Sequence, residues 1–392
     1  MPPVKKKKKT AAADKKLERT HPFSVGAGML TGARWFELTG QHRTEDPAHT
    51  EFVMRLHNQQ TISIDDFKRH RLLSKSDFED PNSPWLTASV IVSTNRERCT
   101  LTDLMARRFA KAKGTIVIRW PTKWKNWKQK PPPQHVVRAL EDPCFYEYFV
   151  AGAAGFFSDN VNKRIGIVNA KSFTMCSLTA ANEEDSYLIT VYARNAEPGS
   201  VITLSEEPVS VNVALEQEHF DPDSWRTLKM MSIVNHKVVI PVVPGTTKVK
   251  VDVMVHGGGV AHRPSKVTLQ AFFPIELAFS ITVNKSEGRT LESVILALSD
   301  HRAKMCNFDY KDLCVAMSRV KEATHIRLLL RGRNEMEKWN SLAYLTNLKT
   351  DTTVPAFFAG YDQRADRDWR SDRWDSNRAH LAHQRLKEEH RG

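Results

Sequence analysis

The sequence predicts an α/β fold, in which a parallel sheet with helices on both faces is interrupted by a small all-β module. The β-branched run 87–95 leads into a helical pattern that ends at Gly114, and the strand-like run 115–120 follows. Strand, helix and strand with short connections are typical of a parallel sheet covered by helices. Between about 145 and 268, short β-rich runs such as "SYLITVYARN" alternate with turn residues and show no helical pattern. That spacing predicts a small barrel.

The other elements follow in chain order. Upstream of the first β-branched run, the pattern indicates one strand, two helical stretches and a loop, at 33–43, 47–58, about 64–74 and 76–86. Downstream of the all-β module the α/β pattern resumes, with strands at 279–283, 293–298 and 325–330 and a helix at 310–322. Gly114 stands where a glycine commonly ends a helix.

These patterns divide the chain into five segments. We expect a basic loop or disordered segment at 1–30, an α/β domain in two parts at 31–144 and 269–332, the all-β insert at 145–268, and a charged tail at 333–392. The tail carries nearly balanced charges, which indicates a solvated helix or a disordered segment, with partner binding as the alternative.

The composition limits the cellular setting. The 392 residues are 41% hydrophobic, enough for two or three domains. Because no apolar run is long enough to span a bilayer and no hydrophobic segment follows the basic N-terminus, we expect neither membrane anchoring nor secretion. Five cysteines are scattered without a C-x-x-C pair, which predicts reduced thiols and no metal site. We expect a nuclear or cytoplasmic protein, with the nucleus preferred.

The net charge of +13 is concentrated in two segments. Residues 1–20 hold eight basic and two acidic side chains, and residues 105–130 hold nine basic and no acidic ones. Concentrated basic segments on a balanced body indicate a polyanionic partner. The lysines Lys5–Lys9 fit a solvated tail, a nuclear-localisation signal or a phosphate contact.

In the second basic segment, "RWPTKWKNWKQK" alternates tryptophans with lysines. Aromatic faces beside cations suit stacking on unpaired bases next to phosphates. The alternative is a tryptophan cluster that seals a domain junction beneath the lysine stems. The candidate DNA contacts here are Lys123, Trp124, Lys125, Trp127 and Lys128.

A polar turn, "NKSEGRT", follows the apolar run that ends at 283. At the carboxyl end of a parallel strand, Gly288 lets backbone N–H groups approach an anion, while Lys285, Ser286 and Arg289 supply phosphate-type donors. The turn is therefore predicted to contact phosphate.

Five pieces of the chain resemble DNA helicases of the RecD/Pif branch of superfamily 1, in the same order. "FPIELAFSITVNKSEGRT" and "LCVAMSRV" resemble the family's paired "FAITVHKSQGQT" and "YVALSRV" motifs. "ELTGQHR", "VIVSTNRE" and the stretch that ends in "GIVNAKS" are similar to further motifs. The resemblance covers about 30–330 and implies a second RecA-like domain, the parallel sheet predicted above, with an inserted SH3-like barrel.

The resemblance also implies roles for particular residues. Arg43 and Arg319 correspond to arginines that reach the γ-phosphate of ATP, and Gln41 and Gly288 would also contact the nucleotide. Planar cations there stabilise the charge that develops in phosphoryl transfer. The residues that would touch the single strand and couple it to the nucleotide are Thr282, Lys285, Ser286 and Gly288. Arg289, a donor of the same turn, is a further candidate DNA contact. ATP and magnesium are the expected cofactors of the complete helicase, and single-stranded DNA is its partner.

Several residues depart from the family pattern. Asn284 replaces the usual histidine, Glu287 replaces glutamine, and Ala170 with Lys171 replaces a Gly-Thr pair. The chain has no "GK" dipeptide and no "DE" pair, so it lacks the phosphate loop and the magnesium-binding strand. Its opening "MPPV" resembles the end of the family's "GDFFQLPPV" motif, which predicts a longer helicase whose first RecA-like half lies upstream.

Two function classes remain. The first is the C-terminal portion of an ATP-dependent DNA helicase, of the kind carried by Helitron-like transposons, with the missing half supplied by a lost N-terminus or a partner. The second is a non-catalytic single-stranded-DNA-binding protein derived from a helicase domain. An unrelated enzyme is disfavoured, because no catalytic or metal-ligand cluster is visible at a useful spacing.

Overall fold

A computed structural model of the chain contains most of the predicted helices and strands. The described residues are 44–127, 136, 140–216, 232–234, 237–245, 248–257, 260–270, 273–298, 307–350, 352, 356, 359–360 and 376–389. The chain forms two compact units, Arg43–Leu348 and Met1–His42 with Lys349–Gly392. The strand expected at 33–43, with Gln41 and Arg43, lies outside the described residues.

A five-stranded parallel sheet lies in the unit Arg43–Leu348, and it confirms the predicted α/β class. Its order is β1-β17-β16-β2-β15 and every neighbouring pair is parallel. The strands are β1 Arg71–Leu72, β2 Ser89–Val92, β15 Ser280–Thr282, β16 Val294–Leu296 and β17 Ile326–Leu328. All four residues of β2 are buried, as in a central strand covered on both faces.

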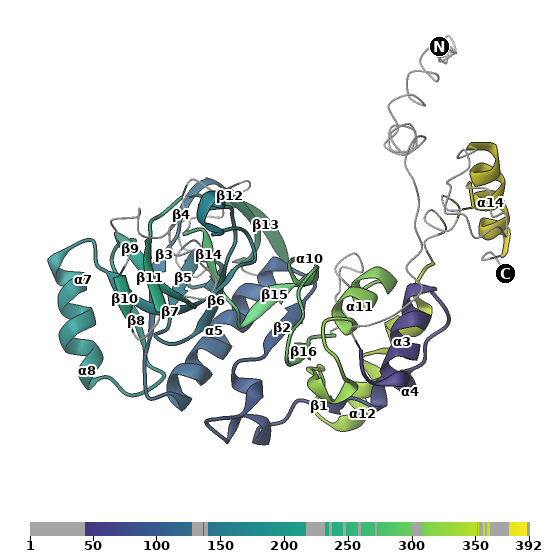
Figure 1. Ribbon diagram of the computed structural model, residues 1–392, viewed down its shortest axis with the longest axis horizontal. Coiled ribbons are helices and arrows are strands. Elements are labelled where there is room, and N and C mark those ends of the chain that lie inside the picture. The colour runs from purple at the N-terminus through teal and green to yellow at the C-terminus, as the bar shows by residue number, and fades with distance from the viewer. Residues whose placement is uncertain are drawn as a thin grey trace, which may run out of the picture. The chain divides into compact units, whose positions relative to one another are not determined.

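Helices cover both faces of this sheet, as Figure 1 shows for α5 on one side and α3 with α11 on the other. Val90 and Val92 of β2 pack with Phe109 of α5, whereas Ile91 packs with Phe52 of α3 and Leu313 of α11. The alternation follows from the two-residue period of a strand. The helices are α3 Pro47–His57, α4 Ile64–Lys68, α5 Asn95–Ala112, α10 Val283–Ser286, α11 Tyr310–Met317 and α12 Glu335–Asn340.

The helix ends follow from local capping. Asp46 accepts a hydrogen bond from the His49 N–H at the start of α3, and Thr94 accepts one from the Glu97 N–H at the start of α5. Gly114, with φ of 67°, lies just beyond α5 as predicted. Two helices are shorter than expected. Helix α4 ends at Lys68, shortly before the chain enters β1, and α11 ends at Met317.

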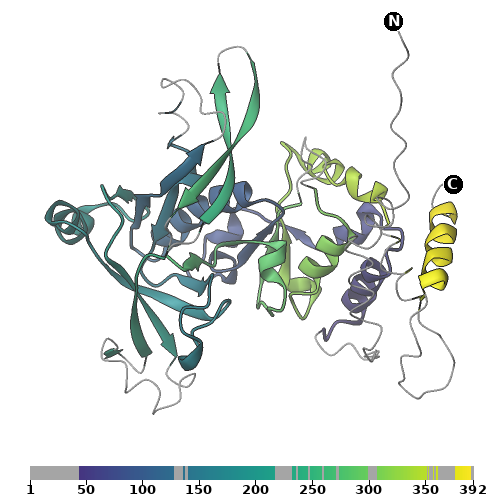
Figure 2. The ribbon, with the colours of Figure 1, turned by 90° about the horizontal axis from the view of Figure 1, so that it is seen from above.

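Three further sheets surround the other side of α5. A six-stranded antiparallel sheet has the order β10-β11-β9-β7-β6-β14, and two three-stranded sheets have the orders β12-β13-β4 and β5-β3-β8. The long β12–β13 hairpin extends away from the other strands (Figure 2). The strands are β3 Val117–Pro121, β4 Lys123–Trp127, β5 Tyr146–Phe149, β6 Ala154–Phe157, β7 Ser172–Thr179, β8 Val201–Thr203, β9 Ser210–Glu216, β10 Ser232–Val234, β11 Lys237–Val242, β12 Lys248–Gly257, β13 Val260–Gln270 and β14 Ile275–Leu277.

Two element predictions are wrong. The run 115–120 forms β3, but it pairs with β5 and β8 and does not join the parallel sheet. The run "SYLITVYARN" is helical, within α7 Glu183–Tyr187, η5 Leu188–Tyr192 and α8 Ala193–Asn195. Asn182 caps this helix and three acidic residues occupy its first turn, so capping outweighs the β propensity of the later residues.

The stretch after β17 includes part of the core, although the sequence predicts a solvated tail from 333. Leu342 and Leu345 are buried in the same cluster as Leu313 of α11. Among the later described residues, α14 Ser376–Glu389 is helical. None of the helices in the described ranges has the length and apolar character needed to cross a membrane.

Candidate functional site

The predicted phosphate-contacting turn lies at the carboxyl end of β15, an edge strand of the parallel sheet. Thr282 ends β15 and is the N-cap residue of α10, and the Ser286 hydroxyl donates to the Val283 carbonyl at 2.7 Å. Ser286 is fully buried, and Gly288 has φ of 76°, which favours glycine. Ser286 therefore stabilises the turn from inside and does not face solvent, whereas Glu287 and Gly288 are exposed.

Arg319, which follows α11, joins the two halves of the paired motif. Its Nη1 donates to the carbonyls of Ser286 and Arg289, at 3.2 Å each. Its Nε donates to the Val315 carbonyl and its Nη2 to the Ser318 hydroxyl, both at 2.7 Å. The side chain is buried, so in this structure the guanidinium holds the turn in place. A contact with a γ-phosphate stays a prediction for the complete protein.

Three cations of the site surround a buried carboxylate, Glu276 of β14. Lys285 forms an ion pair with Glu276, and Arg98 Nη1 lies 3.8 Å from its second oxygen. Burial acts to raise the pKa of Glu276, but Arg98 and Lys285 outweigh it and lower this pKa below its ordinary value. Arg289 lies 4.0 Å from the centre of the Phe156 ring. Burial lowers the pKa of Arg289, and Glu276 opposes that shift.

This ionic cluster connects two sheets. Glu276 belongs to the six-stranded sheet, whereas Lys285 and Arg289 follow a strand of the parallel sheet. Sequence reasoning missed the role of Glu276. The available signal was a single carboxylate within the apolar run 273–283, since a buried charge requires a charged partner.

Within the second basic segment, Lys123–Trp127 form β4, which pairs with β13 at the edge of its sheet. Trp124 is 40% exposed, but Trp127 is buried, with its ring centre 5.6 Å from that of Phe145. Lys123 pairs with Glu207 at 3.1 Å, and Lys125 is exposed. Of the two candidate tryptophans, Trp124 thus presents a ring to solvent and Trp127 belongs to the core. Lys128 lies outside the described residues.

The tryptophan just upstream, Trp120, is also buried and fits the alternative reading of a sealed junction. Its Nε1 donates to Glu147 at 3.1 Å, and its ring centre lies 5.5 Å from that of Phe273. Trp120 and Lys285 line the same cavity, so the two predicted regions lie near one another around it.

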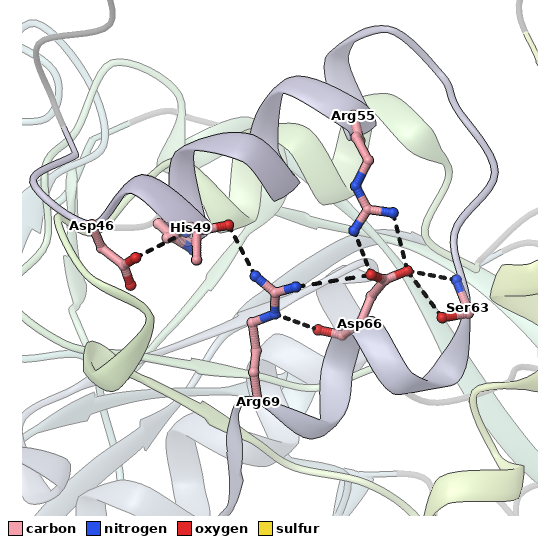
Figure 3. Close-up of polar contacts among 7 residues, drawn as sticks. Asp46, His49, Arg55, Ser63, Asp66 and Arg69 are labelled. Carbon is pink, nitrogen blue, oxygen red and sulfur yellow. Dashed lines mark hydrogen bonds and ion pairs between the residues drawn. The ribbon is translucent and has the colours of Figure 1, made fainter.

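A polar network fixes α3 and α4, which follow the segment that contains Gln41 and Arg43. Asp66 of α4 forms ion pairs with Arg55 of α3 and with Arg69, and Arg69 also donates to the Ala48 carbonyl at 2.9 Å (Figure 3). The network ties the two helices together through one half-buried carboxylate.

A pair of buried histidines, His49 on α3 and His70 after α4, contacts the end of α11 and the segment that follows it. His49 Nε2 lies 3.0 Å from the Met317 carbonyl, and His70 Nδ1 lies 3.3 Å from the Ala323 carbonyl. The two ring centres are 6.2 Å apart. Burial lowers the pKa of both, that of His70 to about 4.

The described residues do not form a complete nucleotide site. Among them, no group of three or more His, Cys, Asp or Glu side chains could hold a metal ion. Arg319 is engaged with backbone carbonyls, and the chain contains no phosphate-loop lysine. These residues therefore do not fit ATP and magnesium by themselves.

No protein-family model matches the sequence, and no curated protein matches it. Solved helicase structures are among the matches to this chain. A Bacteroides Pif1 helicase with ADP-AlF3 and ssDNA has 15% identity over 91% of this chain and 64% of that chain, with a TM-score of 0.45. A Bacteroides Pif1 bound to ssDNA has 14% identity over 92% and 64%, with a TM-score of 0.46.

A Candida albicans Pif1 helicase has 17% identity over 78% of this chain and 58% of that chain, with a TM-score of 0.36. The chain thus spans less than two thirds of the length of each of these helicases. At these identities and TM-scores the likeness carries no argument about function.

Proposed function

We propose that the chain is the C-terminal portion of an ATP-dependent DNA helicase of the RecD/Pif branch, and that it contacts single-stranded DNA. The observation that carries the proposal is the hydrogen bonding of Arg319 to the carbonyls of Ser286 and Arg289. The two sequence motifs that resemble the family are thereby one physical unit at the carboxyl end of β15. We further propose that the all-β insert is an SH3-like barrel and that the protein acts in the nucleus or cytoplasm.

In this proposal the chain contacts single-stranded DNA and couples that contact to the nucleotide site. The missing half supplies the phosphate loop. ATP with magnesium, when bound by the complete protein, supplies the free energy of phosphoryl transfer. Arg319 positions the turn, because its guanidinium holds two turn carbonyls at once. Asn284, Glu287 and Gly288 form the exposed rim of the turn, where a strand could approach.

The second candidate is a non-catalytic single-stranded-DNA-binding protein. It is favoured by the absence of a "GK" dipeptide from the sequence. Both candidates require DNA binding, and they differ in whether a separate phosphate-loop half completes an ATP site. The DNA test therefore comes first.

The test measures binding of a fluorescent oligothymidylate to the purified chain as the salt concentration rises. We expect affinity to fall linearly on a log–log scale, because phosphate contacts release counterions. Trp124→Ala should weaken binding, since base stacking on an aromatic ring contributes about 1–3 kcal/mol. The matched control is Trp339→Ala on α12, a half-buried tryptophan of another element. No measurable binding at low salt would contradict both candidates.

A further inference from the structure

Two cysteines far apart in the sequence are brought together where α5 meets the short 3₁₀ helix η3 Pro143–Phe145. Asp142 accepts a hydrogen bond from the Cys144 N–H at 3.0 Å. Its other carboxylate oxygen pairs with Arg96 at 3.1 Å. Because Arg96 and Cys99 are three residues apart on α5, they share one helix face. The Asp142 carboxylate therefore holds Cys144 against the face that carries Cys99.

The two thiols share one small region of the core. Both are free thiols buried in one cluster with Trp127 and Phe145, and both line one cavity. Disulfide formation needs two sulfur atoms that can approach without backbone movement. Because the two buried side chains belong to one cluster and line one cavity, their sulfur atoms face the same small space.

The charges around the pair make the two thiols unequal. Arg98 Nη2 lies 3.8 Å from Cys99 Sγ. The hydrogen bond from Cys144 and the charge of Arg98 lower the pKa of Cys99 to about 7, although burial, Asp142 and Glu276 oppose them. The same hydrogen bond and burial raise the pKa of Cys144. Cys99 is thus the nucleophile of the pair, and Cys144 keeps its proton.

The pair lines a cavity that can admit a small oxidant. Its volume is about 170 Å³, and Arg98 and Thr102 also line it. Within the described part of the chain, Arg98 Nε and Thr102 Oγ1 have no hydrogen-bond partner although both are buried. These two donors can bind an oxygen-containing molecule such as hydrogen peroxide.

We propose that Cys99 and Cys144 form a peroxide-sensitive dithiol that closes to a disulfide in the folded protein. The Cys99 thiolate attacks one peroxide oxygen, the O–O bond breaks, and hydroxide leaves and takes up the proton released by Cys99, giving a sulfenic acid and water. The Cys144 sulfur then attacks Cys99 Sγ, the S–O bond breaks, and the Cys144 proton leaves with the hydroxide as a second water. The thiols are oxidised and one peroxide is reduced to two waters.

The disulfide would link two parts of the structure that meet beside the ionic cluster. Cys99 lies on α5, which covers the parallel sheet, and Cys144 precedes β5 of a separate sheet. Arg98, the residue before Cys99, contacts Glu276, the carboxylate that also binds Lys285. Oxidation therefore fixes α5 to the segment before β5, beside the ionic cluster. This inference does not depend on the proposed function.

The test treats the folded full chain with hydrogen peroxide, denatures it without reductant, alkylates the remaining thiols and maps the peptides by mass spectrometry. We expect a peptide pair that is linked through Cys99 and Cys144 and has lost two hydrogen atoms. A reductant should separate the two peptides and restore both thiols. The rate of formation should rise as the pH passes through about 7, where the Cys99 thiolate forms.

Matched variants separate this pair from general oxidation. Cys99→Ser should leave Cys144 open to alkylation, and Cys176→Ser, at an exposed cysteine, should leave the linked pair unchanged. If Cys99→Ser fails to fold, the peptide map of the unaltered chain still decides. The proposal is overturned if Cys99 and Cys144 both remain alkylatable after peroxide oxidises Cys176, or if Cys99 ends as a sulfinic acid beside a free Cys144.

Discussion

At the scale of single residues, Arg319 is the most connected side chain of the site. Arg319→Lys keeps the charge but cannot make four hydrogen bonds in the same fork geometry. We expect a loss of about 2–4 kcal/mol in unfolding free energy, because two turn carbonyls lose a charged donor. Amide exchange at Arg289, whose N–H donates to the Ser286 carbonyl, should also accelerate. The control is Arg331→Lys at an exposed position, and equal stability of both variants would contradict this role.

Glu287 is exposed on the rim of the turn. Its carboxylate would repel a nearby phosphate backbone, so Glu287→Gln should tighten binding of single-stranded DNA at low salt. Fluorescence anisotropy with an oligothymidylate measures the change. Glu79→Gln, at another exposed carboxylate, is the control. If Glu287→Gln and the unaltered chain bind equally, the turn does not touch the strand.

The buried histidines make stability depend on pH. The pKa of His70 falls from 6.5 to about 4, so the unfolded chain takes up a proton before the folded chain does. Stability should therefore rise from about pH 4 to pH 6.5 and then level, with about 3 kcal/mol from His70. Denaturant unfolding across this range measures it. His70→Gln should flatten the slope while His57→Gln, at an exposed histidine of α3, should not. An unchanged slope in His70→Gln would contradict the assignment.

At the scale of elements, β4 is an edge strand whose lysines differ in their surroundings. Lys123 pairs with Glu207, so part of its charge is already offset, whereas Lys125 is exposed. Lys125→Ala should weaken DNA binding more than Lys123→Ala, and each lost phosphate contact should lower the log–log salt slope by about 0.7. Lys75→Ala, at an exposed lysine before the 3₁₀ helix η1 Ser76–Phe78, is the control. If Lys125→Ala changes neither affinity nor slope, β4 is not part of the DNA-binding surface.

At the scale of the whole molecule, the chain should not hydrolyse ATP by itself. The phosphate-loop lysine and the magnesium-binding carboxylate are absent from the sequence, and arginines replace neither. A phosphate-release assay with and without single-stranded DNA measures this. DNA-stimulated turnover that Arg319→Ala abolishes would contradict it. Restored turnover on addition of a separate phosphate-loop half would favour the helicase candidate over the non-catalytic one.

The sequence by itself determined the local structure of the α/β part. The β-branched residues 90–92 and the apolar run at 294–296 predicted β2 and β16, and Gly114 predicted the end of α5. These signals are local, since hydrophobic period, capping and a left-handed glycine act within a few residues. The same local signals placed the exposed Glu287 and Gly288 on a turn after a strand.

Only the tertiary structure decided which strands pair and which charges meet. The apolar pattern of 115–120 predicts a strand, but it does not indicate whether that strand joins the parallel sheet or pairs with β5 and β8, as it does in the structure. Arg319 and Ser286 are joined across 33 residues of chain. Glu276 of β14 pairs with Lys285, which follows β15, although these two strands belong to different sheets. Burial and pairing depend on contacts between distant segments, and a carboxylate or a thiol shows its role only once those contacts surround it.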